Sequence, residues 1–173
     1  MKHAFDEPVA TPPALISLYA PIETELARFE AFLSTQLESD FPFVDQLVKH
    51  GFRLGGKRLR PALVLLSAKA SGTVAEAHVH LAAVVELIHT ATLVHDDVLD
   101  EALVRRHLDT VNARWNNETS VLLGDYLFTL ALRVVASLED SYAARAIGEA
   151  SRVMCEGELR QIANRGNYSL GEP

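Results

Sequence analysis

The residues most able to do chemistry form an acidic cluster at the end of an apolar stretch. Four acidic side chains lie within six positions: Asp96, Asp97, Asp100 and Glu101. If the stretch is a helix, Asp96 and Asp100 share one face, where their charges repel unless a cation lies between them. Carboxylates suit Mg²⁺, which proteins commonly hold through one or two of them together with substrate phosphates. The alternative is a water-exposed acidic helix end, which the helix dipole disfavours.

The helix face below this cluster continues as a stripe of modest side chains. At the helical angle of about 100° per residue, Thr92, His89 and Val85 fall on the same side as the first aspartate. Such a stripe could line a cavity, although a core histidine and threonine would give the same pattern. Arg105 and Arg106 follow closely. They can form ion pairs with the acidic groups, which would add little net stability, or hold an anion through paired hydrogen bonds.

A basic segment precedes the cluster in this otherwise acidic chain. Gly55 and Gly56 within it let the backbone approach a ligand closely, and the segment leads into a helix start, where amides and dipole favour anions. It is not a P-loop, because the spacing and the trailing Ser or Thr are missing. A surface patch or a nucleic-acid contact is the plainer interpretation, but the pairing with the acidic cluster favours phosphate. Its cations are Lys49, His50, Arg53, Lys57, Arg58 and Arg60.

Composition places the chain among globular proteins without a disulfide framework. It has 173 residues, a net charge of -7, 49% hydrophobic residues and a single cysteine, Cys155. One domain, or a piece of a larger one, is expected, and the acidic balance argues against a nucleic-acid partner. Residues 1–13 are expected to be a flexible leader and not a secretory signal. No stretch approaches the roughly 18 apolar residues of a transmembrane segment, so a cytoplasmic location is expected.

Apolar residues recur at helical spacing along most of the chain. Pro21 is expected to start or split the first helix, Thr73–Glu76 to form a capping box, and Asp140 to cap a last helix that stops at Gly166. No segment alternates with a period of two, so no sheet is expected. The pattern predicts an all-α helical bundle in one domain over residues 14–173. Helices are expected over about 14–37, 43–48, 62–70, 73–100, 118–138 and 140–163.

Five motifs occur in a fixed order: Gly55–Pro61, Glu86–Asp100, Arg105–Arg106, Gly124–Phe128 and Glu156–Gln161. Together they resemble the trans-isoprenyl diphosphate synthase family over most of the chain. The resemblance implies a helical bundle of the isoprenoid synthase type and a prenyltransferase that joins isopentenyl diphosphate to an allylic diphosphate. In this family Mg²⁺ stabilises the diphosphate leaving group, the isopentenyl double bond attacks the allylic carbocation, and a proton is lost.

The resemblance also assigns roles to single residues. Asp96 and Asp100 would bind Mg²⁺ and, with Arg105 on the allylic diphosphate, would be the catalytic residues. Gln161 would line the allylic site, and Asp97 is not assigned as a direct ligand. Isopentenyl diphosphate would be held by Lys57, Arg60, His89 and Arg106.

Product length depends on the helix face that precedes the first aspartate. In this family, aromatic residues four or five positions before it block the tunnel for the growing chain. Here those positions are Thr92 and Ala91, with Ile88 and Val85 deeper, and none is aromatic. A long polyprenyl product, beyond the C20 class, is therefore expected.

Family members are roughly twice as long and carry a second aspartate-rich motif that is absent here, so the resemblance covers the amino-terminal part of the fold. Asn116 stands where Gly is expected, and Asn tolerates a left-handed backbone.

Half a bundle would expose a large apolar face, so a homodimer or a complementary chain is expected. The alternative function is a non-catalytic subunit. A terpene cyclase would share the aspartates but not explain the basic segment and His89.

Overall fold

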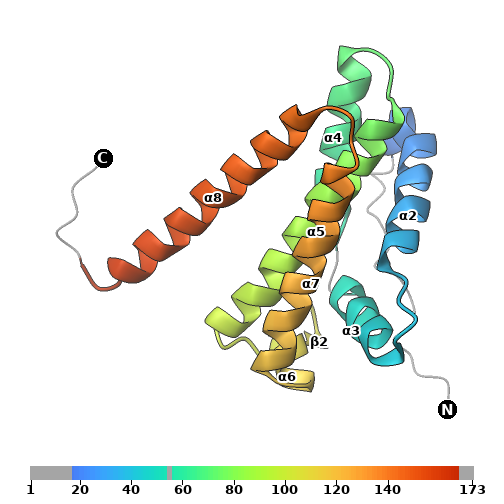
Figure 1. The fold of residues 1–173 in the computed structure, drawn as a ribbon. Coiled ribbons are helices and arrows are strands. Elements are labelled where there is room, and N and C mark those ends of the chain that lie inside the picture. The colour runs from blue at the N-terminus through green and yellow to red at the C-terminus, as the bar shows by residue number, and fades with distance from the viewer. Residues whose placement is uncertain (1–16, 54–55, 168–173) are drawn as a thin grey trace. The chain divides into compact units, whose positions relative to one another are not determined.

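The computed structural model describes residues 17–53 and 56–167, which are mostly helical (Figure 1). The predicted leader, residues 1–13, lies outside the described residues. The chain divides into two compact units, one ending at Ser137 and one beginning at Leu138, and each is described by itself. The first contains η1 (Ala20–Ile22), α2 (Glu23–Leu37), α3 (Pro42–Arg53), α4 (Leu59–Ser71), α5 (Glu76–Leu99), β1 (Val104–Arg105), β2 (Leu108–Asp109), α6 (Val111–Arg114) and α7 (Asn117–Ala136), and the second contains α8 (Ser141–Ala163).

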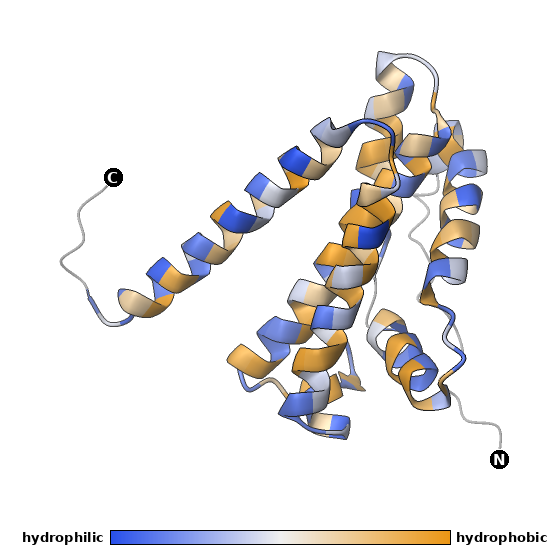
Figure 2. Cartoon of the chain, viewed as in Figure 1, coloured by the Kyte–Doolittle hydropathy of each residue, from blue (hydrophilic) through white to orange (hydrophobic). Residues whose placement is uncertain are grey.

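The core of the first unit lies where α5 packs against α7, α4 and α2. Leu87 and Val94 of α5, Leu127 of α7 and Phe29 of α2 are fully or almost fully buried. Each such side chain stabilises the fold by about 1.5–3 kcal/mol relative to an exposed position. Figure 2 shows the apolar residues running along α5 and α7. This packing fixes α5, the helix that carries the acidic cluster.

A glycine allows α7 to approach α5 closely beside that cluster. A Cβ atom on Gly124 would lie 2.2 Å from His95 Nε2. The same ring nitrogen lies 3.1 Å from the Val121 carbonyl oxygen and 3.5 Å from Asp125 Oδ1. Any larger residue at position 124 would push the His95 ring away, which gives the motif Gly124–Phe128 a packing role.

The expectation that no stretch approaches a transmembrane segment is wrong on length and composition, because α5 and α7 both meet those two criteria. About half of the apolar window of each helix is buried inside the fold, 50% and 44% respectively. Core helices of this length have the same composition, and the packing of α5 on α7 accounts for it.

Most helix boundaries agree with the sequence predictions. Pro21 lies in the 3₁₀ turn η1, which separates the start of the described chain from α2. Asp140 caps α8, because its side chain accepts a hydrogen bond from Tyr142 N at 2.8 Å. Gly166 follows α8 with a left-handed φ of 82°, as expected after a helix end. The prediction of a helical fold is confirmed.

Three local predictions are wrong. Thr73 does not cap α5; the helix begins at Glu76, and the Ala75 N–H donates to His78 Nδ1 at 2.9 Å instead. The helix predicted over about 43–48 is too short, because α3 runs from Pro42 to Arg53. Asn116 is extended, not left-handed, with φ of -173°, and its side chain accepts from Thr119 N at 2.7 Å as the cap of α7. An Asn at this position is therefore a good helix cap.

A small antiparallel hairpin contradicts the expectation of no sheet. Val104 pairs with Asp109, and Arg105 pairs with Leu108. Each strand has two residues, too few to produce a period-two pattern in the sequence. The two turn residues, Arg106 and His107, both have positive φ (52° and 67°), a conformation that hairpin turns usually give to Asn or Gly.

Candidate active site

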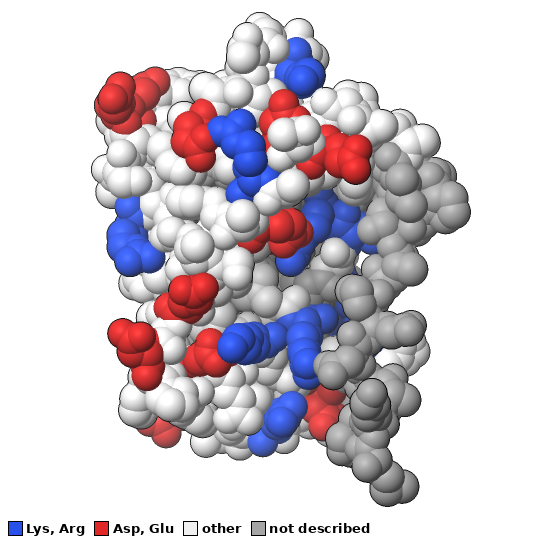
Figure 3. All heavy atoms as spheres, turned by 90° about the vertical axis from the view of Figure 1, so that its right-hand side faces the viewer, with Lys and Arg blue, Asp and Glu red and all other residues white. Residues whose placement is uncertain are grey.

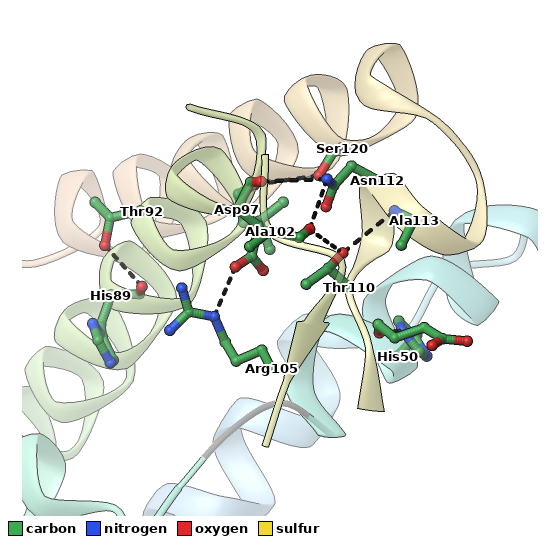
Figure 4. Close-up of polar contacts among 12 residues, drawn as sticks. His50, His89, Thr92, Asp97, Ala102, Arg105, Thr110, Asn112, Ala113 and Ser120 are labelled. Atoms are coloured by element: carbon green, nitrogen blue, oxygen red, sulfur yellow. Dashed lines mark hydrogen bonds and ion pairs between the residues drawn. The ribbon is translucent and has the colours of Figure 1, made fainter. Parts of the chain in front are cut away.

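The three aspartates at the end of α5 have different surroundings, and Figure 4 shows the contacts of Asp97. Asp97 is 1% exposed, and its Oδ1 accepts a hydrogen bond from Arg105 Nε at 2.8 Å. Its second oxygen, Oδ2, is buried and has no hydrogen-bond partner among the described residues. Asp96 is half-buried, and Asp100 is exposed as the C-cap of the helix. Only Asp97 faces the protein interior.

Electrostatics reinforce this difference. Burial raises the pKa of the Asp97 carboxyl above its ordinary value, and the negative charge of Asp100 adds to that rise. The hydrogen bond and positive charge of Arg105 oppose it and favour the ionised form. The Asp97 carboxylate is therefore bound to Arg105, whereas the side chains of Asp96 and Asp100 reach the surface.

Polar contacts tie the segment after α5 to the end of that helix. Thr110 Oγ1 donates to the Ala102 carbonyl oxygen at 2.8 Å and accepts from Ala113 N at 3.3 Å. Asn112 Nδ2 donates to the same Ala102 oxygen at 3.0 Å and to the Asp97 carbonyl oxygen at 3.3 Å. These bonds hold the hairpin, and with it Arg105, against α5. No sequence motif marks either polar side chain, so neither was predicted.

The basic segment does not act as one positive field. Lys49 Nζ lies 2.8 Å from Asp45 Oδ2 in the same helix. Arg58, which caps α4 with a left-handed φ of 52°, donates to Glu30 and to the buried Glu86, each at 2.8 Å. Arg58 therefore joins α2, α4 and α5 together. Lys49 and Arg58, neither of which was assigned to a substrate, are thus paired within the protein.

His50, also in that segment, has a structural role. Its Nε2 lies 2.8 Å from the Asp109 carbonyl oxygen, and its Nδ1 lies 3.3 Å from Arg114 Nη1. Because a guanidinium only donates, Nδ1 must accept, so Nε2 carries the proton and donates to the carbonyl. Burial first, and then the charges of Arg114 and Arg53, lower the pKa of His50, although the bond to Asp109 opposes this. The neutral ring joins α3 to the hairpin.

The positive charges of three arginines act on His89. Burial lowers the pKa of His89, and the charges of Arg60, Arg106 and Arg105 lower it further, while Glu86 opposes them. Figure 3 shows Lys and Arg gathered around a hollow in one face of the molecule. Among the described residues, the side chains of Lys57, Arg60 and Arg106 form no ion pair. A neutral histidine among unpaired cations suits an anion.

A small cavity lies under this group of cations. Its walls come from α3, α5, the connection before α4 and the hairpin turn, and they include two of the candidate anion-binding residues. It is lined by Gly51, Gly56, Glu86, His89, Thr90, Leu93, Val94 and Arg106.

The residues predicted to set product length do not share one environment. Val85, Ile88 and Thr92 are half-buried on α5, whereas Ala91 is 1% exposed. Thr92 Oγ1 donates to the His89 carbonyl oxygen at 2.8 Å, which satisfies its hydroxyl within the helix. The first three residues therefore form an open stripe that runs up to His89 and Asp96.

The donors at the end of α5 fit Mg²⁺ in chemistry. No group of three or more His, Cys, Asp or Glu side chains arranged for a metal occurs in the described part of the chain. Two carboxylates four positions apart supply what Mg²⁺ usually takes from a protein when substrate phosphates complete its shell. Gln161 lies on α8, in the second unit, and its place relative to these residues stays a prediction.

Comparison with known structures first defines the class of fold. A polyprenyl synthase from Caulobacter crescentus CB15, complexed with calcium and isoprenyl diphosphate, matches with a TM-score of 0.85 and 33% identity over 95% of this chain and 50% of its own. A decaprenyl diphosphate synthase from Rhodobacter capsulatus matches with a TM-score of 0.84 and 38% identity over 89% of this chain and 48% of its own. The fold is that of the isoprenoid synthases.

Sequence comparison then gives the family. The polyprenyl synthetase family model matches residues 41–172, so the chain belongs to that family. The octaprenyl diphosphate synthase of Escherichia coli strain K12 is 42% identical over 148 residues, which are 86% of this chain and 46% of that enzyme. The chain thus spans about half the length of the curated relatives it matches. The family resemblance predicted from the motifs is confirmed.

Proposed function

We propose that this chain supplies the amino-terminal part of the active site of a polyprenyl diphosphate synthase. The observation that carries the proposal is the arrangement within one unit of two kinds of site. Two carboxylates, Asp96 and Asp100, stand at the end of α5. About two helical turns before the first of them, the positive charges of Arg60 and Arg106 act on His89, whose pKa is lowered. A metal-bound diphosphate and a second diphosphate would then lie beside each other, as chain elongation requires.

Each group has a distinct task in this proposal. Asp96 and Asp100 hold Mg²⁺, which when bound neutralises charge on the allylic diphosphate as it leaves. Arg105 binds that diphosphate through its terminal nitrogens while Asp97 holds its Nε. The second substrate, isopentenyl diphosphate, is bound by Lys57, Arg60, His89 and Arg106. Fixed charges of this kind orient both substrates and stabilise the departing anion.

The product of this reaction is a long prenyl chain. The stripe of Val85, Ile88 and Thr92 has no aromatic side chain that would stop a chain growing along α5. Ala91, although buried, is also small. Gln161 of α8 lines the allylic site in this proposal. The comparison with octaprenyl and decaprenyl synthases supports a product of that class.

The domain over residues 14–173 works with further protein, in the cytoplasm, as a homodimer or with a complementary chain. Leu63 of α4 and Leu122 and Leu132 of α7 are 63%, 61% and 48% exposed, which offers apolar side chains for contact with a partner. This observation also favours the second candidate function. In that case the chain is a non-catalytic subunit that binds a partner through this surface.

Prenyl transfer by the purified chain tests the proposal. Farnesyl diphosphate, labelled isopentenyl diphosphate and Mg²⁺ are supplied to the chain alone and to the chain with a candidate partner, with Asp96→Ala beside each. Long labelled products that disappear in the variant are expected. Product formation that requires this chain but is unchanged by Asp96→Ala would contradict the catalytic proposal and favour the non-catalytic subunit.

A further inference from the structure

Gly56 and Arg106 are 50 positions apart in the sequence and meet in space. An ideal Cβ on Gly56 would lie 2.5 Å from Arg106 Nη1, 2.9 Å from Nη2 and 3.1 Å from Cζ. The guanidinium of Arg106 therefore occupies the space that any other side chain at position 56 would fill. The sequence suggested that Gly55–Gly56 admits a ligand closely, but at Gly56 the group that approaches is an arginine of the same chain.

The backbone that carries Arg106 has little freedom to move. Arg106 and His107 form a two-residue turn with positive φ at both positions, and such conformations persist only where the surroundings impose them. Arg105, the preceding residue, is bound to the buried Asp97 at 2.8 Å. A change at Gly56 would therefore be absorbed by the Arg106 side chain, because the turn itself is held.

The neighbourhood of this contact belongs to the proposed anion site. Gly56, His89 and Arg106 line the same small cavity. Arg106 is also one of the charges that lower the pKa of His89. Moving the guanidinium away from Gly56 would thus move it relative to His89.

We propose that Gly56 is a positioning residue that fixes the guanidinium of Arg106 beside His89, so that the missing side chain at position 56 sets the affinity for the second diphosphate. This rests on the proposed function, which gives Arg106 to isopentenyl diphosphate. Gly56 does not have a positive φ, so Ala can adopt its backbone conformation. The clash falls on the far end of a flexible side chain, and the variant should fold.

A double-mutant cycle on the active protein, with its complementary chain if activity requires one, tests this role. Gly56→Ala is expected to raise the KM for isopentenyl diphosphate about tenfold, the loss of one misplaced charge-assisted hydrogen bond, and to leave the KM for the allylic diphosphate unchanged. In the Arg106→Ala background, Gly56→Ala should have no further effect, because the group through which it acts is gone. Additive effects would overturn the proposal.

Gly148→Ala is the matched control, since a Cβ there meets no atom within 4 Å; it should change neither KM. A substrate-free readout separates this proposal from the proposed function. The NMR signal of the Arg106 guanidinium, assigned by its loss in Arg106→Ala, should shift in Gly56→Ala and not in the control. An unmoved signal overturns the positioning role. If the wild type transfers no prenyl group, the proposed function fails, while the NMR comparison still decides the role of Gly56.

Discussion

Two kinds of carboxylate stand next to each other at the end of α5. Asp97 is 1% exposed and bonded to Arg105, whereas Asp100 is exposed and Asp96 is half-buried. On a helix, residues four apart share a face, and the residue between them turns by about 100° toward another side. A run of aspartates is therefore not a uniform set of metal ligands. The surface pair suits a metal, and the residue that faces the interior instead holds an arginine.

The largest effect should follow removal of a surface carboxylate. Asp96→Ala and Asp100→Ala are each expected to lower kcat for prenyl transfer about 1,000-fold, because a metal that stabilises the leaving diphosphate is lost. Thermal denaturation of Asp100→Ala should match the wild type, since that side chain is exposed. Steady-state rates across a Mg²⁺ titration measure the loss. Full activity in either variant would remove the distinction between the two kinds of aspartate.

A smaller and different effect is expected from the buried aspartate. Asp97→Asn keeps an oxygen for Arg105 Nε but removes the charge, which weakens a charge-assisted hydrogen bond and should raise the KM for the allylic diphosphate about tenfold. The Mg²⁺ concentration for half-maximal rate should stay unchanged. Asp109→Asn serves as the control, because Asp109 is exposed and lies in the same hairpin as Arg105. It should affect neither the KM nor the Mg²⁺ requirement. A shifted Mg²⁺ requirement in Asp97→Asn would make Asp97 a metal ligand after all.

The support of the hairpin can be tested through stability. Thr110 is fully buried, caps α6 and donates to the Ala102 carbonyl oxygen at 2.8 Å. Thr110→Val should lower the free energy of unfolding by about 1–2 kcal/mol, because a cap and a buried hydrogen bond are lost. Thr129→Val, at an exposed position where the hydroxyl bonds only within α7, should cost much less. Chemical denaturation compares the two, and equal losses would deny Thr110 this role.

The smallest expected effect is on the pH dependence of stability and concerns His50. Both of its ring nitrogens have partners, whereas Asp97 Oδ2 has none among the described residues. Burial, Arg114 and Arg53 lower its pKa in the folded state, so the unfolded state binds the proton more readily. Stability is then complete above the unfolded pKa, about 6.5, and is lost as the pH falls below it. Unfolding free energies between pH 7.5 and pH 5 should show this loss. The slope should weaken in His50→Gln and persist in His107→Gln; an equal slope in all three proteins would contradict it.

The sequence predicted the long elements well because their signals are long. Twenty or more residues of helical period specify α5 and α7, and their predicted ends differ from the observed ends by only a few residues. The four-residue spacing of Asp96 and Asp100 likewise separates them from Asp97 through helical geometry alone. Such features depend only on residues that are close together in the chain.

Contacts between distant residues could not be predicted in this way. Arg58 looked like one more cation of the basic segment, yet it is bound to Glu30 and Glu86, 28 positions away on either side. Gly56 was expected to let a ligand approach the backbone, but the space beside it is filled by the guanidinium of Arg106. The hairpin has strands of two residues and a turn without Gly or Asn, so neither periodicity nor turn composition marks it. Tertiary packing decides each of these.

Calorimetric titration of farnesyl diphosphate, with and without Mg²⁺, tests the division of the acidic cluster most directly. It needs the wild type, Asp100→Asn and Asp97→Asn. In the wild type Mg²⁺ should tighten binding, and Asp100→Asn should abolish that gain. Asp97→Asn should keep the gain while binding more weakly both with and without Mg²⁺, because it acts through Arg105. If both variants lose the Mg²⁺ effect alike, the separate roles of the buried and surface aspartates are contradicted.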